Sequence, residues 1–227
     1  MSGGHSRWED VKAAARRKAS RAGRDPIAEA RAADQAAAEA GRRKAADVGD
    51  PWAEPVDLGV SIDPGAPLPH LLADGLRAVL VFQAGLDPDP NWDGTTVTVV
   101  DPADAAARRL SWIVFEGVAH VSLGGPNDEA QHGHPLYAAG LRHYQAHEVH
   151  SSDLVAEMER RNRVHPHHRP EAFQSLRHLI IAFHDETFDC VSRSWTSGTI
   201  TTSFEDGLVV AVAALRTGEF AAPEGRP

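Results

Sequence analysis

The longest strand-like stretch of the chain is HLIIAFHDETFDCVSRSW, at residues 178–195. Successive side chains of a β-strand point to opposite faces, so Leu179, Ile181 and Phe183 would share one apolar face. His184 would then lie on the opposite, more open face. We therefore predict a single long strand that supplies the core with one face and presents histidine on the other.

Four further apolar or β-branched runs predict strands, and two runs predict helices. The strands are expected at residues 76–84, 95–101, 110–123 and 144–150. The helices are expected at 154–163, capped by Ser152 or Asp153, and at 207–216. Short turns rather than regular crossover helices join the strands, which favours antiparallel pairing. The sequence thus predicts an α+β fold, with a mainly antiparallel sheet and helices on one side.

The first 47 residues differ in composition from the rest of the chain. They hold 11 Lys and Arg against 7 Asp and Glu, whereas residues 48–227 hold 12 against 25. Alanine and charged residues favour helix, and Asp25-Pro26 favours a break, so we predict an arm of two helices at about 7–23 and 26–46. Such Ala-faced helices are marginal alone. We expect them to dock onto the body of the protein, to pair with another chain or to stay partly disordered, and another protein is the favoured partner.

The chain divides into four parts by composition. Residues 48–70 contain five prolines, which is too many for a helix or a central strand. We therefore predict a basic Ala-rich helical arm at 1–47 and a Pro-rich linker at 48–70. A histidine-rich α+β domain would follow at 71–220, and a disordered tail at 221–227.

Several features predict a cytoplasmic protein. Cys190 is the single cysteine, and a lone thiol suits a reducing compartment. The N-terminus lacks the apolar segment of a secretory signal. No run approaches the roughly 18–20 apolar residues that span a bilayer, so we expect no membrane association. Nucleic acid is a weaker alternative partner, because a net charge of +4 over 47 residues is a weak electrostatic footprint.

Histidines are concentrated in one part of the chain. Eleven of the 13 fall between positions 120 and 184, and histidine is both the commonest metal ligand and the usual general acid or base near neutral pH. The spacing matches neither an HExxH nor a CxxC motif. We expect any chemistry or specific binding to lie in this stretch.

The best candidates for a metal site are three of these histidines. His134 lies in a turn, His165 in a loop between a helix and a strand, and His184 on the open face of the long strand. They would bind a divalent ion, with Zn favoured, and Asp185 or Glu148 would act as base or as a second layer of ligands. Zinc would lower the pKa of a bound water to about 7.

Two hypotheses about function therefore remain open. One is an interaction or accessory protein, similar in style to bacterial immunity proteins or antitoxins, in which the helical arm docks onto a partner. The other is a metal-dependent hydrolase that uses the histidine cluster. The lack of a catalytic spacing favours the first by a small margin.

The histidine-rich domain resembles a family of uncharacterised bacterial proteins. The shared motifs are GGPNDE, GHPLY, HEVxxS, NxVHPxH and FHDxTFxC, in this order within about residues 64–195. The resemblance implies that certain residues belong to the family pattern, namely His134, Glu148, Asn162, His165, His168, His178, His184, Asp185 and Phe188. It carries over no reaction. Asp189 stands where the family often has Glu, which argues against a strict geometric role for it.

A second resemblance concerns only the N-terminus. The stretch RWEDVKAAARRK, at residues 7–18, is similar to the helix that precedes the helix-turn-helix in some actinobacterial antitoxins. No recognisable helix-turn-helix follows it. The resemblance is consistent with a docking role for the arm.

Overall fold

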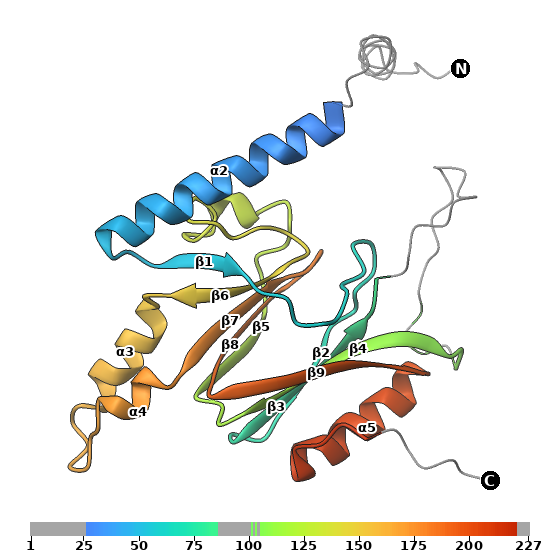
Figure 1. The fold of residues 1–227 in the computed structure, drawn as a ribbon. Coiled ribbons are helices and arrows are strands. Elements are labelled where there is room, and N and C mark those ends of the chain that lie inside the picture. Colours follow the sequence, from blue (N-terminus) through green and yellow to red (C-terminus); the bar gives the residue numbers. More distant parts are fainter. Residues whose placement is uncertain (1–25, 86–100, 102, 104, 222–227) are drawn as a thin grey trace, which may run out of the picture.

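The computed structural model of the protein describes residues 26–85, 101, 103 and 105–221 (Figure 1). Two antiparallel sheets form the body. The five-stranded sheet has the order β1-β6-β7-β8-β5, and the four-stranded sheet has the order β2-β3-β4-β9. The strands are β1 (Trp52–Pro55), β2 (His70–Ala73), β3 (Arg77–Gln83), β4 (Arg108–Glu116), β5 (His120–Gly124), β6 (Ala146–His150), β7 (Arg177–Ala182), β8 (Thr187–Ser192) and β9 (Ser194–Thr202).

Helices lie outside the two sheets. They are α2 (Pro26–Val48), α3 (Asp153–Asn162), α4 (Glu171–Gln174) and α5 (Phe204–Thr217), with a short 3-10 turn at Gln131–Gly133. This content confirms the predicted α+β class. The predicted strands at 76–84 and 144–150 appear as β3 and β6, and the predicted helices at 154–163 and 207–216 as α3 and α5. None of the helices in the described parts of the chain is long and apolar enough to cross a membrane.

The stretch 178–195 is not one long strand, so that prediction was wrong. It forms the β7–β8 hairpin and the first residues of β9. The hairpin closes where the backbone N–H of Phe183 donates to the carbonyl of Glu186 over 2.9 Å. Polar residues 184–186 fit a turn better than a buried strand, and His184 therefore lies in the turn rather than on a strand face.

The predicted strand or bent pair at 110–123 proves to be two strands, β4 and β5, in different sheets. Gly117 lies between them at a φ of 63°, in the left-handed region that glycine adopts without strain. Gly117 is thus the point where the chain leaves one sheet for the other. Most of the strand predicted at 95–101 lies outside the described residues.

The main core lies between the two sheets. Ala78, Leu80 and Phe82 of β3 face Leu179 and Ile181 of β7 within one cluster of buried side chains. The other face of β3 is buried as well, because Val79 and Val81 pack with residues of α5. A strand that is apolar at nearly every position fits this place between two layers.

Different segments of the protein pack on the outer faces of the two sheets. The helix α5 packs on the four-stranded sheet, whereas α2 and the segment 134–141 lie beside the five-stranded sheet (Figure 1). The expected single sheet with helices on one side is therefore corrected to two stacked sheets with helices on both outer sides. A second apolar sheet face has to be covered, and α5 covers it.

The predicted second helix of the arm, at 26–46, is present as α2, whereas the predicted first helix lies outside the described residues. The C-terminal half of α2 packs on the body: Ala38 is buried, and Gly41 approaches the carbonyl oxygen of Ala138. Arg142 Nε donates to Asp34 Oδ2 over 2.8 Å. Within the expected linker, β1 pairs with β6 as an edge strand.

Gly41 determines how closely α2 can approach the body. A Cβ at this position would lie 2.0 Å from the backbone oxygen of Ala138. Gly→Ala in a helix normally stabilises by about 1 kcal/mol. Here we expect Gly41→Ala to destabilise the protein by about 1–3 kcal/mol, because helix and backbone must move apart. Thermal unfolding measures the change, with Gly133→Ala as a control in open space. An increase in Tm for Gly41→Ala would contradict this contact.

Candidate functional site

A set of polar side chains lies on the outer face of the five-stranded sheet. His178 of β7 lies opposite Val191 of β8, and Asp189 of β8 lies opposite Ile180 of β7. His178 and Asp189 therefore share one face as diagonal neighbours. His120 of the edge strand β5 pairs with Val191 and lies on the same face. The opposite face of β7 and β8 belongs to the core between the sheets.

Ser152 connects this face to α3. The backbone N–H of Val155 donates to Ser152 Oγ over 3.2 Å, so Ser152, one of the two residues predicted as the cap, is the N-cap of α3. The same Oγ lies 2.7 Å from His178 Nδ1. His178 Nε2 in turn lies 3.0 Å from Asp189 Oδ1. Serine, histidine and aspartate are thus joined in one hydrogen-bonded chain.

In the hydrogen-bonded chain of Ser152, His178 and Asp189, each donor and acceptor can be assigned. A carboxylate only accepts, so the proton of neutral His178 lies on Nε2 and is donated to Asp189. His178 Nδ1 is then an acceptor, and the hydroxyl of Ser152 donates to it. The imidazole is only 5% exposed, which makes these hydrogen bonds stronger than they would be in water. Asp189 Oδ1 also lies 4.0 Å from His120 Nε2.

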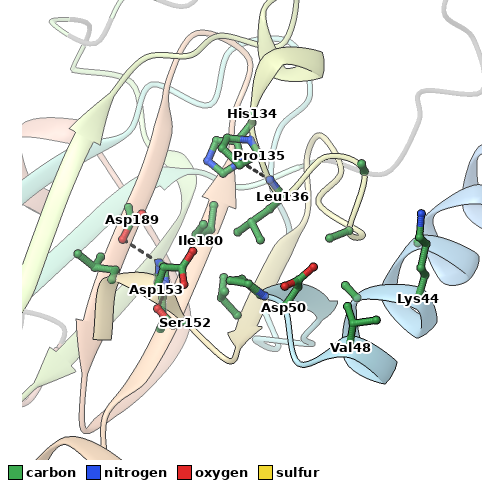
Figure 2. Close-up of a pocket in the computed structure, with 18 residues that line it drawn as sticks. Lys44, Val48, Asp50, His134, Pro135, Leu136, Ser152, Asp153, Ile180 and Asp189 are labelled. Atoms are coloured by element: carbon green, nitrogen blue, oxygen red, sulfur yellow. Dashed lines mark hydrogen bonds and ion pairs between the residues drawn. The ribbon is translucent and has the colours of Figure 1, made fainter. Parts of the chain in front are cut away.

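The three residues border a cavity of about 630 Å³, here called the first cavity. Its floor is apolar, with Leu136, Val149 and Ile180 almost fully buried. Figure 2 shows Ser152, Asp153 and Asp189 on one side of the cavity and the α2 residues Lys44 and Val48 on the other. The cavity therefore combines an apolar floor with a few converging polar groups, as small-molecule sites usually do.

His134 lies on a further wall of the first cavity (Figure 2). The backbone N–H of Leu136 donates to His134 Nδ1 over 3.1 Å, so the proton of the neutral ring lies on Nε2. Burial lowers the pKa of His134, an effect that Asp189 opposes and His178 reinforces. His134 is therefore a neutral donor near neutral pH.

A second cavity, of about 870 Å³, lies beneath α3 and α4. Val155, Phe173 and Leu176 give it apolar walls. Val149, Ser152 and His178 border both cavities. The serine and the histidine consequently stand where the two cavities adjoin.

The three predicted metal ligands lie in different places. His134 borders the first cavity, whereas His184 lies in the β7–β8 turn, with Nδ1 2.8 Å from Asp185 Oδ1. His165 is exposed in the loop after α3 and accepts from the backbone N–H of His167. Across the described part of the chain, no three His, Cys, Asp or Glu side chains are grouped so that they could hold a metal ion.

The two predicted catalytic carboxylates are engaged elsewhere. Glu148 accepts two hydrogen bonds from Arg177, of 2.7 and 2.6 Å, and this pairing lowers the pKa of the carboxyl. Asp185 is 71% exposed and hydrogen-bonded to His184, which raises the pKa of that histidine. Neither carboxylate borders the first cavity.

Sequence reasoning did not identify Ser152, His178 and Asp189 as a site. Ser152 was predicted only as a helix cap, and a strict geometric role for Asp189 seemed disfavoured, although it holds the ring of His178. Ser152 lies at the start of α3, 26 positions before His178 of β7, and His178 lies 11 positions before Asp189 of β8. No local motif links them. The signals in the sequence were a possible helix cap at Ser152, a histidine in a strand, and the resemblance, whose HEVxxS motif ends on Ser152 and whose pattern includes His178.

His147 is the fully buried histidine of this face. It lies on β6 opposite Ile180, and its two ring nitrogens have no hydrogen-bond partner in the described structure. Burial lowers its pKa to about 4. The backbone of Gln145 opposes this shift, whereas the nearby Arg42 and Arg142 reinforce it. Because the ordinary value is about 6.5, the unfolded chain takes up a proton first as pH falls.

We therefore expect His147 to reduce stability as pH falls from about 6.5 to 4, by about 3 kcal/mol over the whole window. Urea unfolding at several pH values measures this slope. His147→Leu should remove that part of the slope, whereas His167→Ala, at an exposed position, should retain it. An unchanged slope in His147→Leu would show that His147 does not titrate in this window.

Comparison of the chain with family models, with curated proteins and with solved structures found no match. A function for this site must therefore be inferred from its residues and their geometry.

Proposed function

We propose that the protein is a hydrolase that cleaves an acyl bond, with Ser152 as nucleophile, His178 as general base and Asp189 as the carboxylate that orients it. The observation that carries the proposal is the hydrogen-bonded chain of 2.7 and 3.0 Å at the wall of a cavity. A nucleophile within reach of a base that a third group orients is the signature of covalent acyl transfer.

The first half-reaction forms an acyl-enzyme. Ser152 Oγ attacks the carbonyl carbon of the substrate while its proton passes to His178 Nδ1. The ring becomes a cation, which the hydrogen bond from Nε2 to Asp189 stabilises. The bond to the leaving group then breaks, and His178 returns the proton to the leaving atom.

The second half-reaction restores the serine. Water attacks the acyl carbon, its proton passes to His178 Nδ1, and the acid leaves as Ser152 regains the proton. In the familiar serine proteases, the serine meets Nε2 and the aspartate meets Nδ1. Here the two nitrogens are exchanged. Either nitrogen of an imidazole can accept the proton while the other donates, so the chemistry is the same.

The start of α3 supports the negative charge that develops on the carbonyl oxygen. The first N–H groups of a helix lack partners within the helix and carry the positive end of its dipole. Asp153 and Leu154, the two residues after the nucleophile, border the first cavity. Backbone donors next to the nucleophile typically stabilise such an oxyanion.

Covalent labelling tests the proposal. A fluorophosphonate should modify Ser152, found by peptide mass spectrometry, and Ser152→Ala should abolish the adduct. Ser203→Ala is the matched control, because Ser203 also caps a helix, α5, through a bond from Asp206 N. Each variant should lose about 1 kcal/mol of stability, but Ser203→Ala should keep the label. Equal labelling in both variants, or no label on Ser152, would refute the proposal.

We also propose, as a second candidate function, a cytoplasmic accessory protein that docks a partner through residues 1–47. What favours it is the exposure of every residue from 28 to 37 of α2, although this stretch is mostly alanine. Apart from the ion pair of Asp34 with Arg142, this stretch has few large apolar residues and gains little from packing on the body. A partner would supply that missing contact.

Site-specific crosslinking in the source cell tests this second candidate. A photo-crosslinking residue in place of Ala33, which is exposed on α2, should give one discrete adduct. The same residue in place of Arg160, which is exposed on α3, should not give that adduct. No adduct at Ala33, or the same adduct at both positions, would count against docking through this helix.

A further inference from the structure

We infer that the substrate spans both cavities, with a short apolar acyl group in the first and a ring-sized, uncharged leaving group in the second. The inference rests on the proposed function of Ser152. The substrate class is an ester or amide of a small aliphatic acid.

The two cavities adjoin at the reacting group. Ser152, His178 and Val149 are the three residues that border both. A carbonyl carbon bound at Ser152 Oγ has two substituents, the acyl group and the leaving group. One can extend into each cavity, which leaves the scissile bond over the serine.

The carbonyl oxygen and the acyl group belong to the first cavity. Asp153 and Leu154, the first residues of α3 after Ser152, border this cavity and not the second. His134, whose proton lies on Nε2, offers a further neutral donor from another wall of this cavity. The floor beneath them is formed by Leu136 and Ile180, at 8% and 1% exposure. Such a floor favours a hydrocarbon chain over a polar group.

The leaving group belongs to the second cavity. His178 must protonate the leaving atom, and its ring borders this cavity too. The cavity is the larger of the two, at about 870 against 630 Å³, and Phe173 and Leu176 provide surfaces for a ring.

The charges of the second cavity are neutralised in pairs. Arg177 holds Glu148 by two hydrogen bonds and stacks on Trp195, with 3.8 Å between the guanidinium carbon and the ring centre. Arg163 donates to Glu159, which also pairs with His168 at 2.8 Å. Each arginine already has a carboxylate partner, so these walls offer no free charge to an ionic leaving group. An uncharged alcohol or amine fits them best.

A pair of tryptophan substitutions tests the assignment. Ala45 of α2 borders only the first cavity and Ala156 of α3 only the second. Two substrate pairs separate the subsites: p-nitrophenyl hexanoate against p-nitrophenyl acetate varies the acyl group, and 4-methylumbelliferyl acetate against phenyl acetate varies the leaving group. The measured quantities are the two ratios of kcat/KM.

Ala45→Trp should lower the hexanoate-to-acetate ratio at least about tenfold and retain the umbelliferyl-to-phenyl ratio. Ala156→Trp should do the reverse. Ala36→Trp, at an exposed position of α2 that borders neither cavity, should change neither ratio. Wild-type protein that a fluorophosphonate does not label at Ser152 would refute the proposed function itself. Labelled protein in which both variants shift both ratios alike, shift neither, or shift them in the opposite sense would overturn the assignment of the cavities.

Discussion

The register between β7 and β8 is the constraint on which both the core and the site depend. Pairing of Ile180 with Asp189 and of His178 with Val191 places Leu179 and Ile181 between the sheets. It places His178 and Asp189 together on the outer face. A slip by one residue would turn every side chain of the strand to the other face. The core tolerates no other register between β7 and β8. Burial of apolar side chains on the inner face of the hairpin therefore also fixes how the polar side chains on its outer face are placed.

The sequence pattern alone predicts an element whose bounds follow from its own periodicity and capping residues. The apolar run of β3, the short strand β6 and the helices α3 and α5 follow from periodicity and capping. The β7–β8 hairpin was missed because residues 184–186 interrupt a run that is otherwise strand-like. The site could not be predicted, because Ser152, His178 and Asp189 meet only through the register and through the position of α3. Histidine density pointed to a stretch of the chain that includes His178, but the three histidines it favoured lie apart, because His165 and His184 are in loops and His134 borders the first cavity.

The hydrogen-bonded chain and His147 show two ways in which one sheet face buries polar groups. Ser152, His178 and Asp189 are hydrogen-bonded to one another, and burial strengthens these hydrogen bonds. The ring nitrogens of His147 make no hydrogen bond of ordinary geometry, and burial together with the nearby Arg42 and Arg142 lowers the pKa of the ring. The Oγ atom of Ser152 both caps α3 and is the proposed nucleophile. Helix position and nucleophile position therefore cannot vary independently.

The close approach of Gly41 to Ala138 has a consequence for how this protein can change in evolution. The helix that it holds supplies Lys44 and Val48 to the wall of the first cavity, yet α2 contributes none of the three residues proposed to react. A change that tilts or shifts α2 would alter the width of that cavity and leave the hydrogen-bonded chain in place. The choice of substrate could therefore diverge through a peripheral segment while the chemistry stays the same.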